Sequence, residues 1–283
     1  MKEALQEENE RMETPLTHTP LLTNKHAVIF GAGGAVGTAV AKEFAAQGAT
    51  VFLSGRTLGA VEQVAEEIHQ DGGVAYAAQV DALDEQAVNA YLDRVAQEGG
   101  SIDILLNVMG PQPRDYGNGT STLELPLEKF LLPLSTLVPS QFITARATAR
   151  HMVRQRSGVI LFVTAGLDMT KTPNVTAIGA AFGAMESLLR CLAADLGQAS
   201  VRVVGIRSGA MAETRTIQQG IERVVNTMGV SKAQVVSQFE QATLLKRLST
   251  AADTARVAAF LASDGARTLT GAIVNASSGR VID

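Results

Sequence analysis

Short apolar runs recur along the chain, and more polar stretches separate them. The runs are rich in Val, Ile and other branched or aromatic side chains, and charges rarely interrupt them. They occupy residues 26–30, 50–53, 74–78, 104–107, 159–164, 201–206 and 272–275. Nearly unbroken apolar runs of this length are typical of strands in a parallel sheet that is covered on both faces.

The stretches between the runs show the period of amphipathic helices. Their apolar residues fall on one helical face, as in residues 38–46, 58–70 and 84–97. Strands that alternate with helices require right-handed crossovers, so the pattern predicts an α/β fold with a doubly wound parallel sheet. We expect a single domain over residues 25–283, preceded by a flexible, polar N-terminal tail over residues 1–24.

One region breaks this regular pattern. Residues 110–139 contain five prolines and the loop sequence Asp115-Tyr116-Gly117-Asn118-Gly119. Proline removes a backbone donor and clashes with the preceding helical turn, so this region cannot all be regular helix.

Composition narrows the class of protein. The chain has 283 residues, is 46% hydrophobic and carries a net charge of -4, as expected of an ordinary soluble domain without a nucleic-acid or anionic-membrane partner. No segment approaches the roughly 20 apolar residues that span a bilayer, and the acidic N-terminal tail lacks the apolar core of a signal peptide. The four histidines show no metal-binding spacing, so no metal is expected.

The chain has one cysteine, Cys191, within the apolar run 188–194. We therefore expect a buried, inert thiol rather than a nucleophile. A single cysteine allows no disulfide framework, which fits a reducing compartment and predicts a cytoplasmic protein.

A glycine-rich turn follows the first apolar run directly. Its sequence is Gly31-Ala32-Gly33-Gly34-Ala35-Val36-Gly37, and a helix follows it. Glycines at such a strand-to-helix turn let the backbone approach a pyrophosphate, and the helix amino terminus supplies free N–H groups and a positive dipole. We predict that Gly31, Gly33, Gly34 and Val36 bind a dinucleotide.

The end of the second run predicts which dinucleotide binds. A carboxylate at this point would hold a ribose diol and repel a 2′-phosphate, but the sequence offers Gly55 and then Arg56. A guanidinium can pair with a phosphate, so NADP(H) is favoured over NAD(H). The alternative is that Arg56 is a solvated side chain at a strand end.

From residue 24 onward the chain resembles the short-chain dehydrogenase/reductase family, whose fold is a Rossmann-type sheet. The glycine turn resembles the family's TGxxxGxG, with Phe30 in place of Thr and Ala35 in place of the middle Gly. The resemblance extends to segments that line the cofactor in the family, and it implies cofactor contacts from Asp81, Ala82, Asn107, Val108, Gly110, Gly209 and Thr214. Segments near the carboxy terminus, 245–250, 260–264 and 269–271, resemble those that build the family's tetramer, which implies a homotetramer or dimer.

The family's catalytic positions carry unexpected residues. Counting back from Leu192-Ala193-Ala194-Asp195-Leu196, which resembles the family's LAxEL, places its Tyr and Lys on Ile178 and Phe182. The Ser falls on Ala165 and the relay Asn on about Leu137. No Tyr follows residue 152, so a shifted Tyr-Lys pair cannot be recovered. Ile178 and Phe182 are expected to present an apolar wall to the nicotinamide, or else to be simply core residues.

Replacement groups must come from nearby loops. Thr164 ends the fifth run, and Asp168, Thr170 and Lys171 follow it, whereas Arg114, Asp115 and Tyr116 follow the fourth run. A phenol can donate a proton and a hydroxyl can orient an oxygen, so we take Thr164 and Tyr116 as candidate catalytic residues. Ordinary loop polarity accounts for the same residues equally well.

The sequence thus favours an NADP(H)-dependent oxidoreductase with an unusual active site. It would transfer hydride to a small carbonyl, an imine or an activated alkene. Two alternatives remain open, a non-redox enzyme on the same scaffold and a cofactor-binding regulatory protein without turnover.

Overall fold

The computed structural model describes residues 20–169 and 172–282. It contains a seven-stranded sheet in the order β3-β2-β1-β4-β5-β6-β7, with every neighbouring pair parallel. The strands are β1 (His26–Phe30), β2 (Thr50–Gly55), β3 (Val74–Gln79), β4 (Ile104–Asn107), β5 (Gly158–Thr164), β6 (Val201–Ser208) and β7 (Ile273–Ala276). This arrangement confirms the predicted doubly wound α/β fold.

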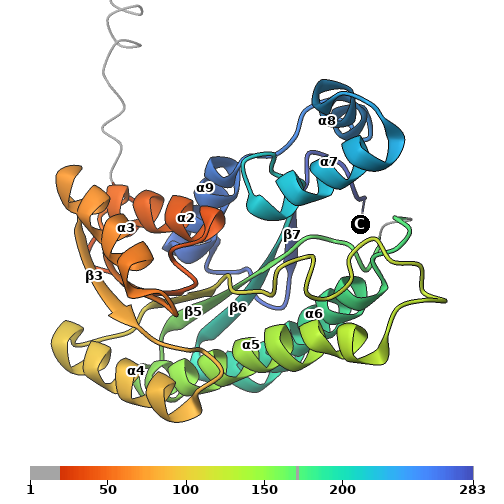
Figure 1. Ribbon diagram of the computed structural model, residues 1–283. Helices are drawn as coiled ribbons and strands as arrows, with labels where there is room; N and C mark the ends of the chain where they lie inside the picture. The colour runs from red at the N-terminus through yellow and green to blue at the C-terminus, as the bar shows by residue number, and fades with distance from the viewer. Residues whose placement is uncertain (1–19, 170–171, 283) are drawn as a thin grey trace, which may run out of the picture.

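Helices cover both faces of the sheet (Figure 1). One layer holds α2 (Ala35–Ala46), α3 (Leu58–Gln70) and α9 (Ala251–Ala262), and the other holds α4 (Glu85–Gly99), α5 (Leu127–Gln155) and α6 (Thr176–Leu196). Short 3-10 turns follow α6 and α9, at Gly197–Ala199 and Asp264–Ala266. Between β6 and α9 the chain forms α7 (Arg215–Met228) and α8 (Lys232–Gln241), which stand to one side of the layers.

The sheet separates two hydrophobic cores. Along β1, Val28 and Phe30 belong to the core beneath α4, α5 and α6, whereas Ala27 and Ile29 belong to the core beneath α2, α3 and α9. All four side chains are fully buried. Successive side chains of a strand point to opposite faces, so an unbroken apolar run is what a strand between two helical layers requires.

Helices do not cover both faces of strand β3. This strand lies at the edge of the sheet, and Val74 and Tyr76 are about half exposed, at 47% and 53%. The prediction that every strand is covered on both faces is therefore wrong for β3, because an edge strand has a single neighbour and only partial helical cover.

Two segment boundaries differ from expectation, whereas the prediction that 110–139 is not all regular helix is confirmed. Helix α2 begins at Ala35, three residues before the predicted start, because the end of the glycine turn already forms its first turn. Leu22 is fully buried and its amide donates to the Gln47 carbonyl at 2.9 Å, so the packed domain begins before residue 25. Helix α5 includes Pro133 and Pro139, which leaves 108–126 as the irregular region.

Helix α6 corrects two expectations. Cys191 was predicted to be buried, but it is exposed, because it lies on the face of α6 opposite the buried Leu189. Among the residues that the structure describes, Thr176–Ala199 is also the one helical stretch apolar enough to span a membrane, although none was expected. Half of its most apolar window is buried, as in the core helix of a soluble protein.

Candidate functional site

The glycine turn lies at the carboxyl end of β1, tied to β2. The amides of Gly31 and Ala32 both donate to the Ser54 carbonyl, at 2.9 and 3.2 Å. A Cβ on Gly37 would lie 2.3 Å from the Gly31 carbonyl oxygen, so only glycine allows the turn to fold this closely onto the start of α2. The first turn of α2 has no acidic side chain, which leaves its positive end available to an anion.

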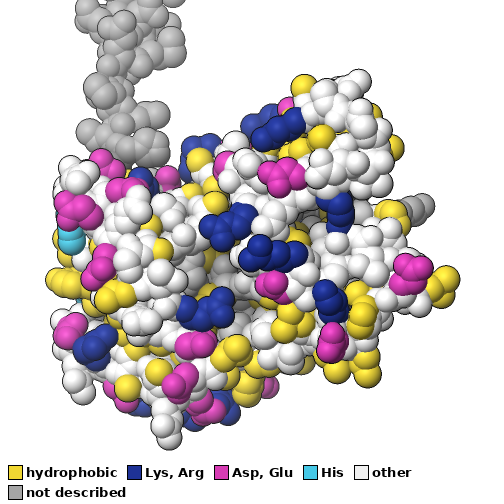
Figure 2. All heavy atoms as spheres, viewed as in Figure 1, with side chains coloured by type: hydrophobic (Ala, Val, Ile, Leu, Met, Phe, Trp, Pro, Cys, Tyr) yellow, Lys and Arg dark blue, Asp and Glu magenta, His cyan; other side chains and the backbone are white. Residues whose placement is uncertain are grey.

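Arg56 lies beside this turn. It follows β2 directly, its side chain is exposed, and its carbonyl accepts a hydrogen bond from Gln79 Nε2 at 2.9 Å. Ser54 therefore bonds to the glycine turn only two residues before Arg56. Lys and Arg side chains are also spread across the middle of the face seen in Figure 2.

Asp81 and Ala82 follow β3 at the same edge of the sheet. Asp81 is exposed, and its Oδ1 accepts the Leu83 amide at 3.0 Å, whereas Ala82 is fully buried. Only the Asp81 side chain of this pair is free to face a ligand.

The segment after β4 packs against the glycine turn. The Val108 amide donates to the Phe30 carbonyl at 3.0 Å, and Gly110 is exposed at the same edge. The Asn107 side chain is buried, and its Nδ2 donates to the Ser140 carbonyl and to Thr144 Oγ1, at 3.1 and 3.0 Å. Asn107 thus fixes α5 to β4, and its side-chain hydrogen bonds are made within the protein.

Gly209 and Thr214, the two predicted cofactor residues after β6, also lie close to other groups of the protein. A Cβ on Gly209 would lie 2.8 Å from Ser249 Oγ. Thr214 caps α7, because its hydroxyl accepts the Ile217 amide at 3.4 Å and donates to the Met211 carbonyl at 2.8 Å. The predicted cofactor residues thus gather at the carboxyl ends of β1, β2, β3, β4 and β6, around the point between β1 and β4 where strand order reverses.

Ile178 and Phe182 lie one turn apart on α6. Ile178 is 5% exposed within the core beneath α5 and α6, and Phe182 packs against that core from a partly buried position. Leu137 on α5 belongs to the same core. None of these side chains can exchange a proton, so they form an apolar wall or plain core, as the sequence suggested.

Thr164 belongs to a buried polar cluster that sequence reasoning missed. Its hydroxyl donates to Glu186 Oε1 at 3.1 Å, and Arg207 contacts both carboxylate oxygens of Glu186, at 2.9 Å and 3.1–3.2 Å. All three residues are at most 3% exposed. The signal in the sequence is the acidic Glu186 among the apolar positions of α6 and the basic Arg207 near the end of the apolar strand β6.

Tyr116 lies in a different group. It packs against residues 174–177 at the start of α6, with 4% of its surface exposed. Burial raises the pKa of its phenol to about 12, against the opposing effect of Arg223. Arg223 itself donates to the Asn118 carbonyl and so joins α7 to the loop that carries Tyr116. A phenol with this pKa remains protonated near neutral pH, so it can donate a proton but cannot act as a base.

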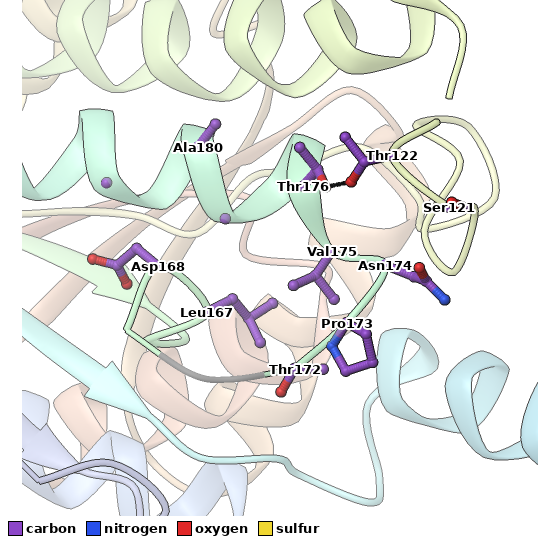
Figure 3. A pocket seen from close by; sticks show the side chains of 12 residues that line it. Ser121, Thr122, Leu167, Asp168, Thr172, Pro173, Asn174, Val175, Thr176 and Ala180 are labelled. Carbon is purple, nitrogen blue, oxygen red and sulfur yellow. Dashed lines mark hydrogen bonds between the residues drawn. The ribbon is translucent and has the colours of Figure 1, made fainter. Parts of the chain in front are cut away.

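An open cavity of about 610 Å³ lies between α6 and the loop after β5 (Figure 3). Asp168 and Leu167 line it from the loop, and Gly179 and Gly183 line it from α6. Burial and then the Glu186 carboxylate raise the pKa of Asp168. Thr170 and Lys171, the other loop candidates, lie outside the described residues. Within the described residues, no three His, Cys, Asp or Glu side chains are grouped to hold a metal ion.

Known proteins share this architecture. A family model described as enoyl-(acyl carrier protein) reductase matches residues 31–280. The 7alpha-hydroxysteroid dehydrogenase of Escherichia coli strain K12 is 32% identical over 260 residues, which are 92% of this chain and 95% of that protein. A versicolorin reductase of Emericella nidulans is 27% identical over 91% of this chain and 96% of its own length.

Solved structures agree with the sequence comparisons. An NAD+-bound xylitol dehydrogenase superposes with a TM-score of 0.84 at 26% identity, covering 91% of this chain and 99% of that one. The fold and the sequence thus point to the same group of proteins.

Proposed function

Because the chain belongs to the short-chain dehydrogenase/reductase family, we propose that it is an NADP(H)-dependent oxidoreductase that works without the family's Tyr and Lys. Its substrate is a small carbonyl, imine or activated alkene. The observation that carries the proposal is the glycine turn folded onto the start of α2, with exposed Arg56 beside it and an apolar pair, Ile178 and Phe182, in place of proton-moving groups.

The residues at the strand edge suit a dinucleotide. The close packing of Gly31 and Gly37 would let a pyrophosphate approach the backbone. The positive end of the α2 helix dipole would face the pyrophosphate, because no acidic side chain in the first turn neutralises it. Asp81 and the backbone of 108–110 would line the adenine and nicotinamide sides. When bound, the reduced cofactor supplies hydride.

Arg56 supports NADP(H) in particular. Its exposed guanidinium stands where a carboxylate would otherwise hold the ribose diol, and no acidic residue follows in 57–61. A 2′-phosphate would therefore be attracted by the Arg56 guanidinium and would not be repelled by a carboxylate from residues 57–61.

The proposed site provides little acid–base chemistry. The Thr164 hydroxyl donates its one hydrogen bond to Glu186 Oε1, so toward a further group it can act only as a hydrogen-bond acceptor. Tyr116 can donate a proton but is enclosed by the loop around it. Substrates that need little help from an ionised Tyr fit this arrangement best.

Two measurements test the proposal together. Fluorescence titration should show tighter binding of NADPH than of NADH, and NADPH should be oxidised in the presence of an enone, imine or ketone. Thr164→Val and Tyr116→Phe, which keep shape and remove a hydroxyl, should then identify any catalytic hydroxyl. Absence of NADPH binding would overturn the proposal.

A second candidate is a cofactor-binding protein without turnover. The burial of Thr164 and Tyr116 favours it, because neither hydroxyl lies open to the cavity beside α6. Tight NADPH binding with no oxidation against any substrate class would select this candidate. A non-redox enzyme would instead act without consuming NADPH.

The proposal extends to assembly and location. Large apolar side chains are exposed on α5 and near the carboxy terminus, including Leu127, Phe142, Leu245 and Phe260. Such surfaces are typical of subunit contacts, so a homotetramer or dimer in the cytoplasm is proposed.

A further inference from the structure

We propose that the cavity between α6 and the loop after β5 receives the substrate as a cation, a protonated imine held by the carboxylate of Asp168. This inference rests on the proposed reductase function and narrows its substrate class. The alternatives within that class, ketones and enones, are uncharged.

The cavity has the size and chemistry for a small organic cation. Its volume of about 610 Å³ falls within the usual range for small-molecule sites. Hydroxyls border it from Ser121, Thr172 and Thr176, and its described lining includes one carboxylate and no Lys or Arg. Leu167 and Val175 supply the apolar surface that a hydrocarbon ring would contact (Figure 3).

Asp168 is placed to act as the counter-charge. A Cβ on Gly183 would lie 3.7 Å from Asp168 Cβ, so the loop packs directly on α6 and brings the carboxylate to the cavity wall. Within residues 20–169 and 172–282, Asp168 forms no ion pair, whereas the neighbouring Glu186 is paired with Arg207.

The charges behind the cavity reinforce this assignment. Glu186 disfavours a second negative charge on Asp168, and both Arg207 and Arg190 are directed at Glu186, at 2.9 and 3.5 Å from its Oε2. A cation in the cavity would stabilise the ionised form of Asp168, because an opposite charge offsets both desolvation and the Glu186 repulsion.

A protonated imine also explains why the family's proton donor is dispensable. The imine carbon accepts hydride from the reduced nicotinamide, and the C=N π electrons become the lone pair of a neutral amine nitrogen. The cofactor is oxidised to NADP+, the imine is reduced, and the N–H proton was already present on the substrate. A ketone would instead become an alkoxide that needs a proton, and neither the apolar pair Ile178 and Phe182 nor an ionised Asp168 can supply one.

The position of the cavity agrees with this role. Gly179 and Gly183 in its wall each follow directly the residues assigned to the family's Tyr and Lys, Ile178 and Phe182. Consecutive helical residues lie about 100° apart around the helix axis, so a substrate lying on these glycines would border the face of α6 that carries the apolar pair.

The test compares a permanent cation with a neutral acceptor. N-Methyl-3,4-dihydroisoquinolinium and 2-cyclohexen-1-one would be offered with NADPH to wild type, Asp168→Asn and the control Asp195→Asn, which removes an exposed carboxylate elsewhere on α6. We expect Asp168→Asn to raise KM for the cation at least about tenfold, with little change for the enone. The Asp195→Asn control should match wild type with both.

A binding measurement keeps the inference independent of turnover. Calorimetric titration with N-methyl-1,2,3,4-tetrahydroisoquinoline, an ammonium at neutral pH, should show saturable binding to wild type that Asp168→Asn loses. An unchanged cation KM or unchanged ammonium binding in Asp168→Asn would overturn the inference. If NADPH binds and only neutral acceptors are reduced, the cation site is wrong while the reductase function stands; if NADPH does not bind, the proposed function itself fails.

Discussion

The Glu186 carboxylate on α6 and the Arg207 guanidinium on β6 form a two-point ion pair in the interior, with Nε 3.2 Å from Oε1 and Nη2 2.9 Å from Oε2. Each residue is 3% exposed. A Cβ on Gly166 would lie 2.7 Å from Arg207 Cδ, so the loop after β5 passes directly over this pair. The pair therefore fixes α6, the end of β6 and the Asp168 loop relative to one another.

Breaking this pair should destabilise the fold strongly. Glu186→Leu should lower the free energy of unfolding by about 3–5 kcal/mol, because it leaves a buried guanidinium without its two-point partner. The double variant Glu186→Leu with Arg207→Met should cost less than the sum of the single changes. Urea denaturation of all four proteins gives the coupling energy, and additive costs would show that the pair is not a unit.

Arg56 should determine cofactor preference. Arg56→Ala should weaken NADPH binding at least about tenfold, since a charge-assisted contact contributes on the order of 1.5–3 kcal/mol, and should leave NADH binding nearly unchanged. Fluorescence titration measures both affinities. Arg267→Ala, an exposed arginine between α9 and β7, is the control. Equal NADPH and NADH affinities in wild type would remove the role given to Arg56.

Asp168→Asn should raise the melting temperature of the ligand-free protein at pH 7. Burial and Glu186 raise the Asp168 pKa above its ordinary value of 3.8, against Arg207 on β6 and Arg190 on α6, so the ionised form disfavours folding. This penalty is fully present above the raised pKa and is lost as pH falls toward 3.8, because the folded state then binds the proton first. The stabilisation should shrink between pH 7 and pH 4 in thermal scans. A lower melting temperature at pH 7 would contradict this account.

Local sequence patterns predict most of the fold. The bounds expected for 58–70 coincide with α3, because its apolar positions repeat with the helical period and Thr57 begins it in extended conformation. The start of α2 was placed too late because its cap, Gly34, has no side chain that signals a helix start. The apolar run 188–194 predicts a buried Cys191, but the helical period of α6 turns that position outward.

The site was less predictable, because its contacts join distant segments. Glu186 and Arg207 lie 21 residues apart and meet only through the packing of α6 on β6. Asn107 and Thr214 are predicted to contact the cofactor, and in the structure both side chains make hydrogen bonds within the protein. Sequence spacing places the candidate residues at the carboxyl ends of the strands. It could not predict which hydroxyl groups form hydrogen bonds within the protein.

The protein should assemble in solution. Phe260 on α9 is 48% exposed and Leu245 is 62% exposed, so both would gain burial in a subunit contact. Light scattering at micromolar concentration should give the mass of a tetramer or dimer. Phe260→Glu together with Leu245→Glu should shift that mass toward the monomer, because carboxylates are costly in an apolar contact. A monomeric wild type would contradict the prediction.

The most direct test of the central claim compares the two reaction directions in one preparation of wild-type protein. NADPH oxidation would be measured against imines, enones and ketones, and NADP+ reduction against simple secondary alcohols. With Ile178 and Phe182 in the place of acid–base groups, we expect NADPH-dependent reduction of an imine or activated alkene and almost no alcohol oxidation, because neither of these two side chains accepts the hydroxyl proton. Robust oxidation of simple alcohols would contradict the account and require a proton acceptor beside the nicotinamide other than the residues identified above.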